Sequence, residues 1–182
     1  MDDIEALRRQ VEGDVWKWIH EFVATPNEFY NFRFPPCPYA RQAVLQEKVD
    51  VLVYTSGNVR AFIKAGAIGM RDSEKIGTRV MAFPPKTKLQ FGLSDFVESL
   101  NADLIKDDVF LNTGYAKTSV SRYPSSPPGE PYFVVIANSL APVLAGCESL
   151  KRTDYYKNWP AEHFGIVVDR RARMARQFGR ND

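Results

Sequence analysis

The amino-acid sequence predicts an α/β fold, in which a central mixed sheet of about four to five short strands is flanked by helices. Short β-branched segments, such as residues 49–54 and 132–137, alternate with amphipathic segments, such as residues 4–24. The chain has 182 residues, of which 45% are hydrophobic and 25% are charged. This length and composition are typical of one globular domain, here residues 1–182, that buries its own core.

The helices are predicted from the spacing of apolar residues. The helical N-terminal segment, residues 4–24, repeats apolar side chains at three- and four-residue steps: Ile4, Leu7, Val11, Val15, Ile19 and Phe22. We expect this stripe to be one buried helix face. Further helices are expected at residues 39–46, 59–68, 94–104 and 139–151, and the basic C-terminal segment 166–182 is expected to be mostly helical.

The strands are predicted from short runs of β-branched and aromatic residues. These runs are residues 28–34, 49–54, 78–83, 108–111 and 132–137. Between the last two lies residues 121–131, which hold four prolines in eleven residues and are therefore expected to be a loop.

Composition excludes several classes of function. The net charge of +2 gives no signal for nucleic-acid binding. The whole supply of soft metal ligands is Cys37, Cys147, His20 and His163, without zinc-site spacing, so neither a metal nor a cofactor is expected. No apolar run is long enough for a membrane span, and the N-terminus does not have the pattern of a secretory signal. We therefore expect a cytoplasmic protein with free thiols.

Cys37 is the main candidate for chemistry. It directly precedes Pro38, and proline is common at the first position of a helix. Unpaired backbone N–H groups at a helix N-terminus stabilise a thiolate, so the pKa of Cys37 is expected to be lowered. Arg33 and Arg41 are close in sequence and would add positive charge.

The sequence Cys37-Pro38-Tyr39-Ala40 resembles the Cys-Pro-Tyr-Cys box of glutaredoxins and other thioredoxin-like proteins. In that family the box lies between a strand and a helix, and a cis-proline before a later strand faces the thiol. The resemblance implies a thioredoxin-like arrangement, in which Pro131 takes the place of that proline and Pro36, Pro38 and Tyr39 shape the substrate site. The chain is also similar to small bacterial proteins of unknown function with a Cys-Pro-Phe-Ala box.

The chain departs from the glutaredoxin pattern in two respects. Ala40 replaces the second cysteine, so a dithiol cycle within the box is impossible. Cys37 and Pro131 are 94 residues apart, which requires a helical insertion. The second thiol, Cys147, shares an apolar helix stripe and is expected to be a core residue. A resolving role would require it to come within about 7 Å of Cys37 between Cα atoms.

The basic C-terminal segment offers a different function. It carries Arg170, Arg171, Arg173, Arg176 and Arg180, a pattern that can bind phosphate or an acidic partner. Together with the aromatic residues of the chain, this basic segment would suit a non-enzymatic accessory or interaction protein. Self-association is one form of this function. A βα turn at residues 55–58 is a further candidate for anion binding, although no Walker motif accompanies it.

The leading hypothesis from the sequence is a single-cysteine thiol redox or thiol-conjugating protein. Cys37 would be its catalytic residue, and a protein or a low-molecular-weight thiol would be its partner. The interaction protein is the alternative.

Overall fold

The computed structural model describes residues 2–85, 87–89, 91–114 and 132–179, and it confirms the predicted α/β fold with a mixed sheet. The four strands are β1 (Val49–Val53), β2 (Thr78–Phe83), β3 (Val109–Gly114) and β4 (Phe133–Ser139). The α-helices are α1 (Asp2–Trp18), α2 (Ala40–Leu45), α3 (Val59–Arg71), α4 (Leu93–Leu104), α5 (Leu140–Leu150), α6 (Ala161–Phe164) and α7 (Arg170–Phe178). Shorter helical turns are the π-helical η1 (Ile19–Val23) and η5 (Gly165–Asp169), and the 3₁₀ turns η2 (Glu28–Tyr30), η3 (Ile105–Asp107) and η4 (Asp154–Tyr156).

The strands lie in the order β1-β2-β4-β3. β1 and β2 run parallel, and α3 connects them, whereas β4 runs antiparallel to both of its neighbours. Val80 of β2 pairs with Val51 of β1 on one side and with Ile136 of β4 on the other. Because side chains alternate along a strand, these three residues point to the same face of the sheet.

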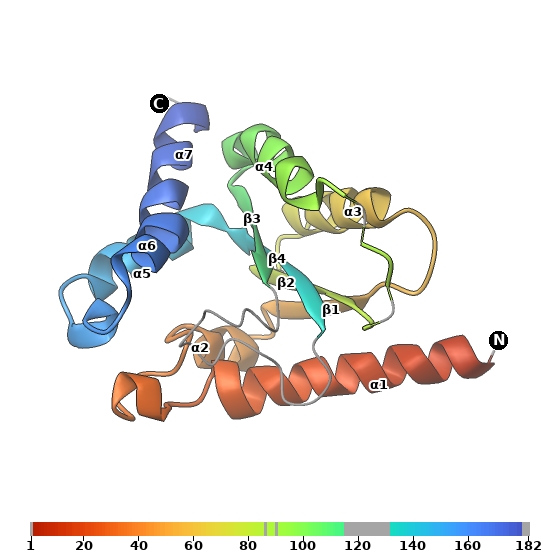
Figure 1. The fold of residues 1–182 in the computed structure, drawn as a ribbon, viewed down its shortest axis with the longest axis horizontal. Coiled ribbons are helices and arrows are strands. Elements are labelled where there is room, and N and C mark those ends of the chain that lie inside the picture. Colours follow the sequence, from red (N-terminus) through yellow and green to blue (C-terminus); the bar gives the residue numbers. More distant parts are fainter. Residues whose placement is uncertain (1, 86, 90, 115–131, 180–182) are drawn as a thin grey trace.

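One face of the sheet is covered by α3 and α4 (Figure 1). Met81, Phe83 and Ile63 are among the fully buried side chains of this layer. The helix α3 approaches β2 closely at Gly66, where a Cβ atom would collide with the Met81 sulfur. We call this side the sealed face.

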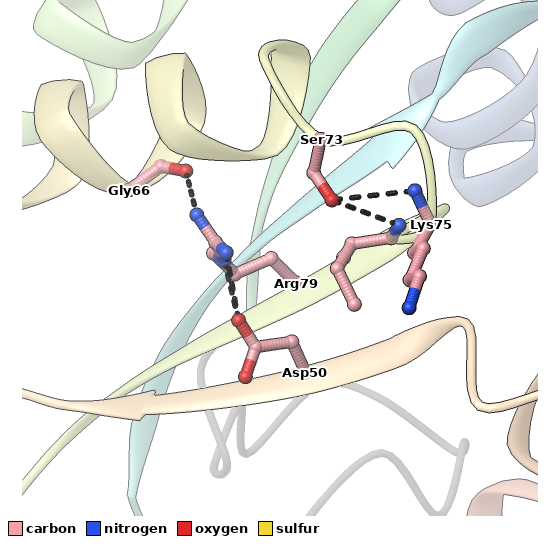
Figure 2. Close-up of polar contacts among 6 residues, drawn as sticks. Asp50, Gly66, Ser73, Lys75 and Arg79 are labelled. Atoms are coloured by element: carbon pink, nitrogen blue, oxygen red, sulfur yellow. Dashed lines mark hydrogen bonds and ion pairs between the residues drawn. The ribbon is translucent and has the colours of Figure 1, made fainter.

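Two polar side chains on the sealed face, Arg79 and Asn101, have hydrogen-bond partners within the protein. Arg79 of β2 donates to the Gly66 carbonyl at 2.9 Å and to the Asp50 carboxylate at 2.8 Å, as Figure 2 shows. The fully buried Asn101 of α4 bonds both the N–H and the C=O of Leu111, at 2.7 and 3.0 Å. Asn101 therefore completes the hydrogen bonds of the edge strand β3, as a buried backbone requires.

The opposite face is covered by α1 and η1, where Val11, Val15, Trp18 and Ile19 pack against the sheet. The predicted helix over residues 4–24 is thus confirmed, but the start of its apolar stripe is exposed. Ile4 and Leu7 are 56% and 41% exposed. Figure 1 shows the reason: the N-terminal half of α1 runs past the edge of the sheet.

The predicted strand at residues 28–34 is wrong. The segment begins with the 3₁₀ turn η2, and Asn31 and Phe32 have the left-handed φ angles of 50° and 56°, which end any extended run. Phe29, Tyr30 and Phe34 pack instead against η4, where the Tyr30 ring stacks on Tyr155 with centroids 4.8 Å apart, whereas Phe32 is exposed. Aromatic residues favour strands only where a neighbouring strand offers a surface for them.

Candidate functional site

A cavity of about 700 Å³ lies on the face opposite the sealed face. Its floor is the sheet, through Val49, Val80 and Ile136. Its walls come from η1, from the segment that leads into α2, and from α5, η4, η5 and α7. The turn of residues 73–77 forms one rim, and there Ser73 Oγ accepts from the backbone N–H groups of Lys75 and Ile76 (Figure 2).

Both cysteines of the chain line this cavity as free thiols. Cys37 lies just before α2, and Cys147 lies on α5, so the fold brings together two thiols that are 110 residues apart in sequence (147 − 37). The expectation that Cys147 is a core residue is wrong, because it is half-buried and faces the cavity rather than packed side chains.

Burial raises the pKa of the Cys37 thiol above its ordinary value, against the sequence prediction. Part of the residue is exposed, but protein atoms surround the sulfur and hinder hydration of a thiolate. The backbone N–H groups of Tyr39 and Ala40 and the charge of Arg171 oppose this effect without outweighing it. The sequence prediction failed because desolvation of the sulfur outweighs these contributions, and because α2, with six residues from Ala40, adds little helix dipole.

The residues predicted to shape the site lie around Cys37 where the structure describes them. Pro36, Pro38 and Tyr39 line the cavity. The Tyr39 ring lies against Gly146 of α5, where a Cβ atom would come within 2.7 Å of the ring, and its hydroxyl donates to the Gly146 carbonyl at 3.2 Å. Pro131 lies outside the described residues.

Among the described basic residues of the C-terminal segment, Arg171 alone is buried, with 7% of its surface exposed. Its Nη1 lies 3.7 Å from Cys147 Sγ, and its Nη2 donates to Asn112 Oδ1 at 3.1 Å. The guanidinium carbon lies 5.4 Å from the centre of the Phe110 ring. In the part of the chain that the structure describes, Arg171 has no carboxylate partner, and its Nε has no hydrogen-bond acceptor.

The other arginines of this segment have different surroundings. Arg170 forms an ion pair with Glu98 of α4, whereas Arg173 and Arg176 are exposed. Arg180 lies outside the described residues. The described arginines of this segment therefore do not form one exposed basic surface, because Arg170 is paired with Glu98 and Arg171 is buried. Binding of phosphate or an acidic partner by these residues stays a prediction.

Two tyrosines complete the polar lining. The Tyr156 hydroxyl interacts with Cys147, and burial raises its pKa, so it remains a protonated donor. Burial also raises the pKa of Tyr155, whose hydroxyl donates to the Pro36 carbonyl. This bond fixes the proline segment before Cys37 against η4.

The sequence pattern could have predicted that Arg171 is buried, but the residue was considered together with the other arginines of the segment. Val168, Arg171, Met174 and Phe178 recur at three- and four-residue steps, so Arg171 occupies a position of the apolar stripe. A charged residue at such a position indicates an internal polar site.

Comparison of the chain with family models, with curated proteins and with solved structures finds no match. The thioredoxin-like arrangement gains no support from the topology, because the strand that the family places before the box is a 3₁₀ turn here. Within the described residues, no helix is long and apolar enough to cross a membrane. The same residues contain no group of three or more side chains of the kinds that hold a metal ion.

Proposed function

We propose that the protein carries out thiol–disulfide exchange with a small molecule in this cavity, with Cys37 as the reacting residue. The observation that carries the proposal is the convergence of Cys37, Cys147 and the buried Arg171 on one cavity of about 700 Å³. This volume is in the usual range of small-molecule sites. A reducing compartment such as the cytoplasm would keep both thiols available.

The exchange step uses the following chemistry. Cys37 loses its proton to solvent, and its thiolate sulfur attacks one sulfur of a bound low-molecular-weight disulfide. A bond forms between the two sulfurs as the disulfide bond of the ligand breaks, and the leaving thiolate takes up a proton and departs as a free thiol. Arg171 and the N–H groups of Tyr39 and Ala40 would stabilise the negative charge on sulfur.

The structure makes this a slow reaction at neutral pH, because the thiolate rather than the thiol is the nucleophile. Because the pKa of Cys37 is raised, most of the thiol stays protonated at any pH below the ordinary thiol pKa. We therefore expect the exchange rate to rise with pH through pH 7–9 without a plateau.

The test is intact-mass and peptide analysis after incubation with bis(2-hydroxyethyl) disulfide. Wild type and the Cys147→Ser variant should each acquire one mixed disulfide on Cys37, whereas Cys37→Ser should acquire none at that peptide. Modification of Cys147 alone, or of neither residue in the folded protein, would refute the proposal. The interaction protein receives less support, because two of the four described C-terminal arginines are paired or buried.

A further inference from the structure

We propose that the cavity binds a small carboxylic acid with an apolar body, and that its carboxylate pairs with Arg171. The inference names the ligand class of the same site, and it rests on the proposed function in so far as the disulfide with which Cys37 exchanges carries such a carboxylate.

The first observation is the incomplete pairing of Arg171. A buried charge is stable only when partners replace its lost hydration, and the partner that fits a guanidinium best is a carboxylate. Arg171 instead meets an amide oxygen, a thiol and an aromatic ring. A guanidinium has five N–H donors, and the described contacts of Arg171 use one each on Nη1 and Nη2, so the second N–H of each of these nitrogens has no partner among them.

The second observation is an unpartnered donor from the opposite end of the chain. Trp18 of α1 lines the same cavity with 6% of its surface exposed, and its buried indole N–H has no acceptor among the described residues. An indole N–H can only donate. Trp18 Nε1 and Arg171 Nε both lack an acceptor among the described residues, and protein atoms cover both, so a ligand with acceptor oxygens would satisfy them after a small side-chain shift.

The charges of the lining also favour an anion. Lys48, Lys75 and Arg171 line the cavity, and Glu74 is the only acidic residue of the described lining. The floor and much of the wall are apolar, with Val49, Val80, Ile136 and Val143 among them. An apolar wall around one deep cation suits an acid whose body is hydrophobic better than it suits inorganic phosphate.

The experiment is calorimetric titration of the full chain with hexanoate, benzoate and phenylacetate, each compared with its neutral amide. At least one acid should bind at least about tenfold more tightly than its amide, which corresponds to one charge-assisted contact of about 1.4 kcal/mol. Arg171→Met should bring the acid to the affinity of the amide, and Arg171→Lys should retain part of the difference. Trp18→Phe should weaken acid binding several-fold. Arg173→Gln, an exposed residue of the same helix, should leave it unchanged.

Three outcomes would overturn the inference. These are equal binding of acids and amides, no binding of any of the three acids at millimolar concentration, and an equal loss in Arg173→Gln. Inorganic phosphate that displaces a bound acid at the concentration of the acid itself would overturn the carboxylic-acid class. Circular dichroism and thermal unfolding of each variant establish that a loss of binding does not reflect unfolding.

The Cys37→Ser variant separates this inference from the proposed function. Acid binding that persists in Cys37→Ser supports the inference even if Cys37 does not exchange with disulfides. If Cys37 does exchange, the anionic 3,3′-dithiodipropionate should react at least about tenfold faster than the neutral bis(2-hydroxyethyl) disulfide at equal pH, and Arg171→Met should remove this preference. Equal rates for the two disulfides in wild type would count against Arg171 as the anion-binding residue.

Discussion

The two faces of the sheet each hold an arginine, and the two arginines differ in how they are paired. On the sealed face, Arg79 is bonded to the Asp50 carboxylate and to the Gly66 carbonyl. On the cavity face, Arg171 has no carboxylate partner among the described residues, and its Nε is unsatisfied. Arg79 joins β1, β2 and α3, whereas Arg171 has N–H donors without a partner among the described residues. Pairing within the protein explains the structural role of Arg79, whereas the missing partner of Arg171 is the feature that the proposed ligand would explain.

The two faces of the sheet also differ in how helices cover them. The sealed face has two helices over the sheet, and its described apolar side chains form one buried cluster. The other face has α1 and η1 over one part and the cavity beside them. Stability should therefore depend mainly on the sealed face, and ligand binding on the cavity face.

The largest expected effect is a truncation in the sealed face. Ile63→Ala should lower the free energy of unfolding by about 3 kcal/mol, because the fully buried side chain leaves a cavity that its neighbours cannot fill. The matched variant Ile136→Ala removes a partly buried side chain that already borders a cavity, and it should cost less than about 1.5 kcal/mol. Urea unfolding measures both. Equal losses would contradict the contrast between the faces.

Asn101 tests the polar part of the sealed face. Asn101→Leu keeps the branched shape but leaves the N–H and C=O of Leu111 unpaired, which should lower the free energy of unfolding by about 2–3 kcal/mol in urea unfolding. Asn101→Asp keeps an acceptor for the Leu111 N–H. The ionised carboxylate has no donor for the Leu111 C=O, whereas the protonated carboxyl group at low pH has one, so the protonated form should be less destabilised. A neutral effect of the leucine variant would show that β3 does not depend on this side chain.

The two arginines give a direct comparison of paired and unpaired charge. Arg79→Met should destabilise the protein by about 2 kcal/mol, because it leaves the Asp50 carboxylate and the Gly66 carbonyl without their donor. Arg171→Met removes a buried charge that has no carboxylate partner among the described residues, so it should be neutral or stabilising by up to about 1 kcal/mol. Thermal and urea unfolding of the ligand-free variants measure the difference. A larger loss in Arg171→Met would contradict it.

The smallest effect is the pH dependence that Cys37 adds to stability. Because burial raises the pKa of the folded-state thiol, the unfolded chain releases its proton first as pH rises. The contribution of Cys37 is therefore complete below the ordinary thiol pKa of about 8.5 and is lost at higher pH. Wild type should lose more stability than Cys37→Ser between pH 8 and 10. A thiolate stabilised by the fold would produce the opposite difference.

Local sequence patterns predicted most of the helices and strands. The strand prediction at residues 28–34 failed because Phe29, Tyr30 and Phe34 pack in a cluster around Tyr155, a contact between segments about 120 residues apart. The apolar stripe of α1 was predicted correctly in period but not in burial, since the length of the sheet decides how much of the helix is covered. Periodicity reports the local conformation and not the surface that a helix meets.

Sequence alone determined the α/β class, the N-terminal helix and the importance of Cys37 as a candidate. The tertiary structure decided which groups share a site with it: Cys147 from α5 and Arg171 from α7. It also reversed the expected pKa shift of Cys37, because desolvation depends on the atoms that surround the sulfur and not on its neighbours in the chain. Burial and charge pairing are properties of the assembled fold, and they separate a structural arginine from one that can bind a ligand.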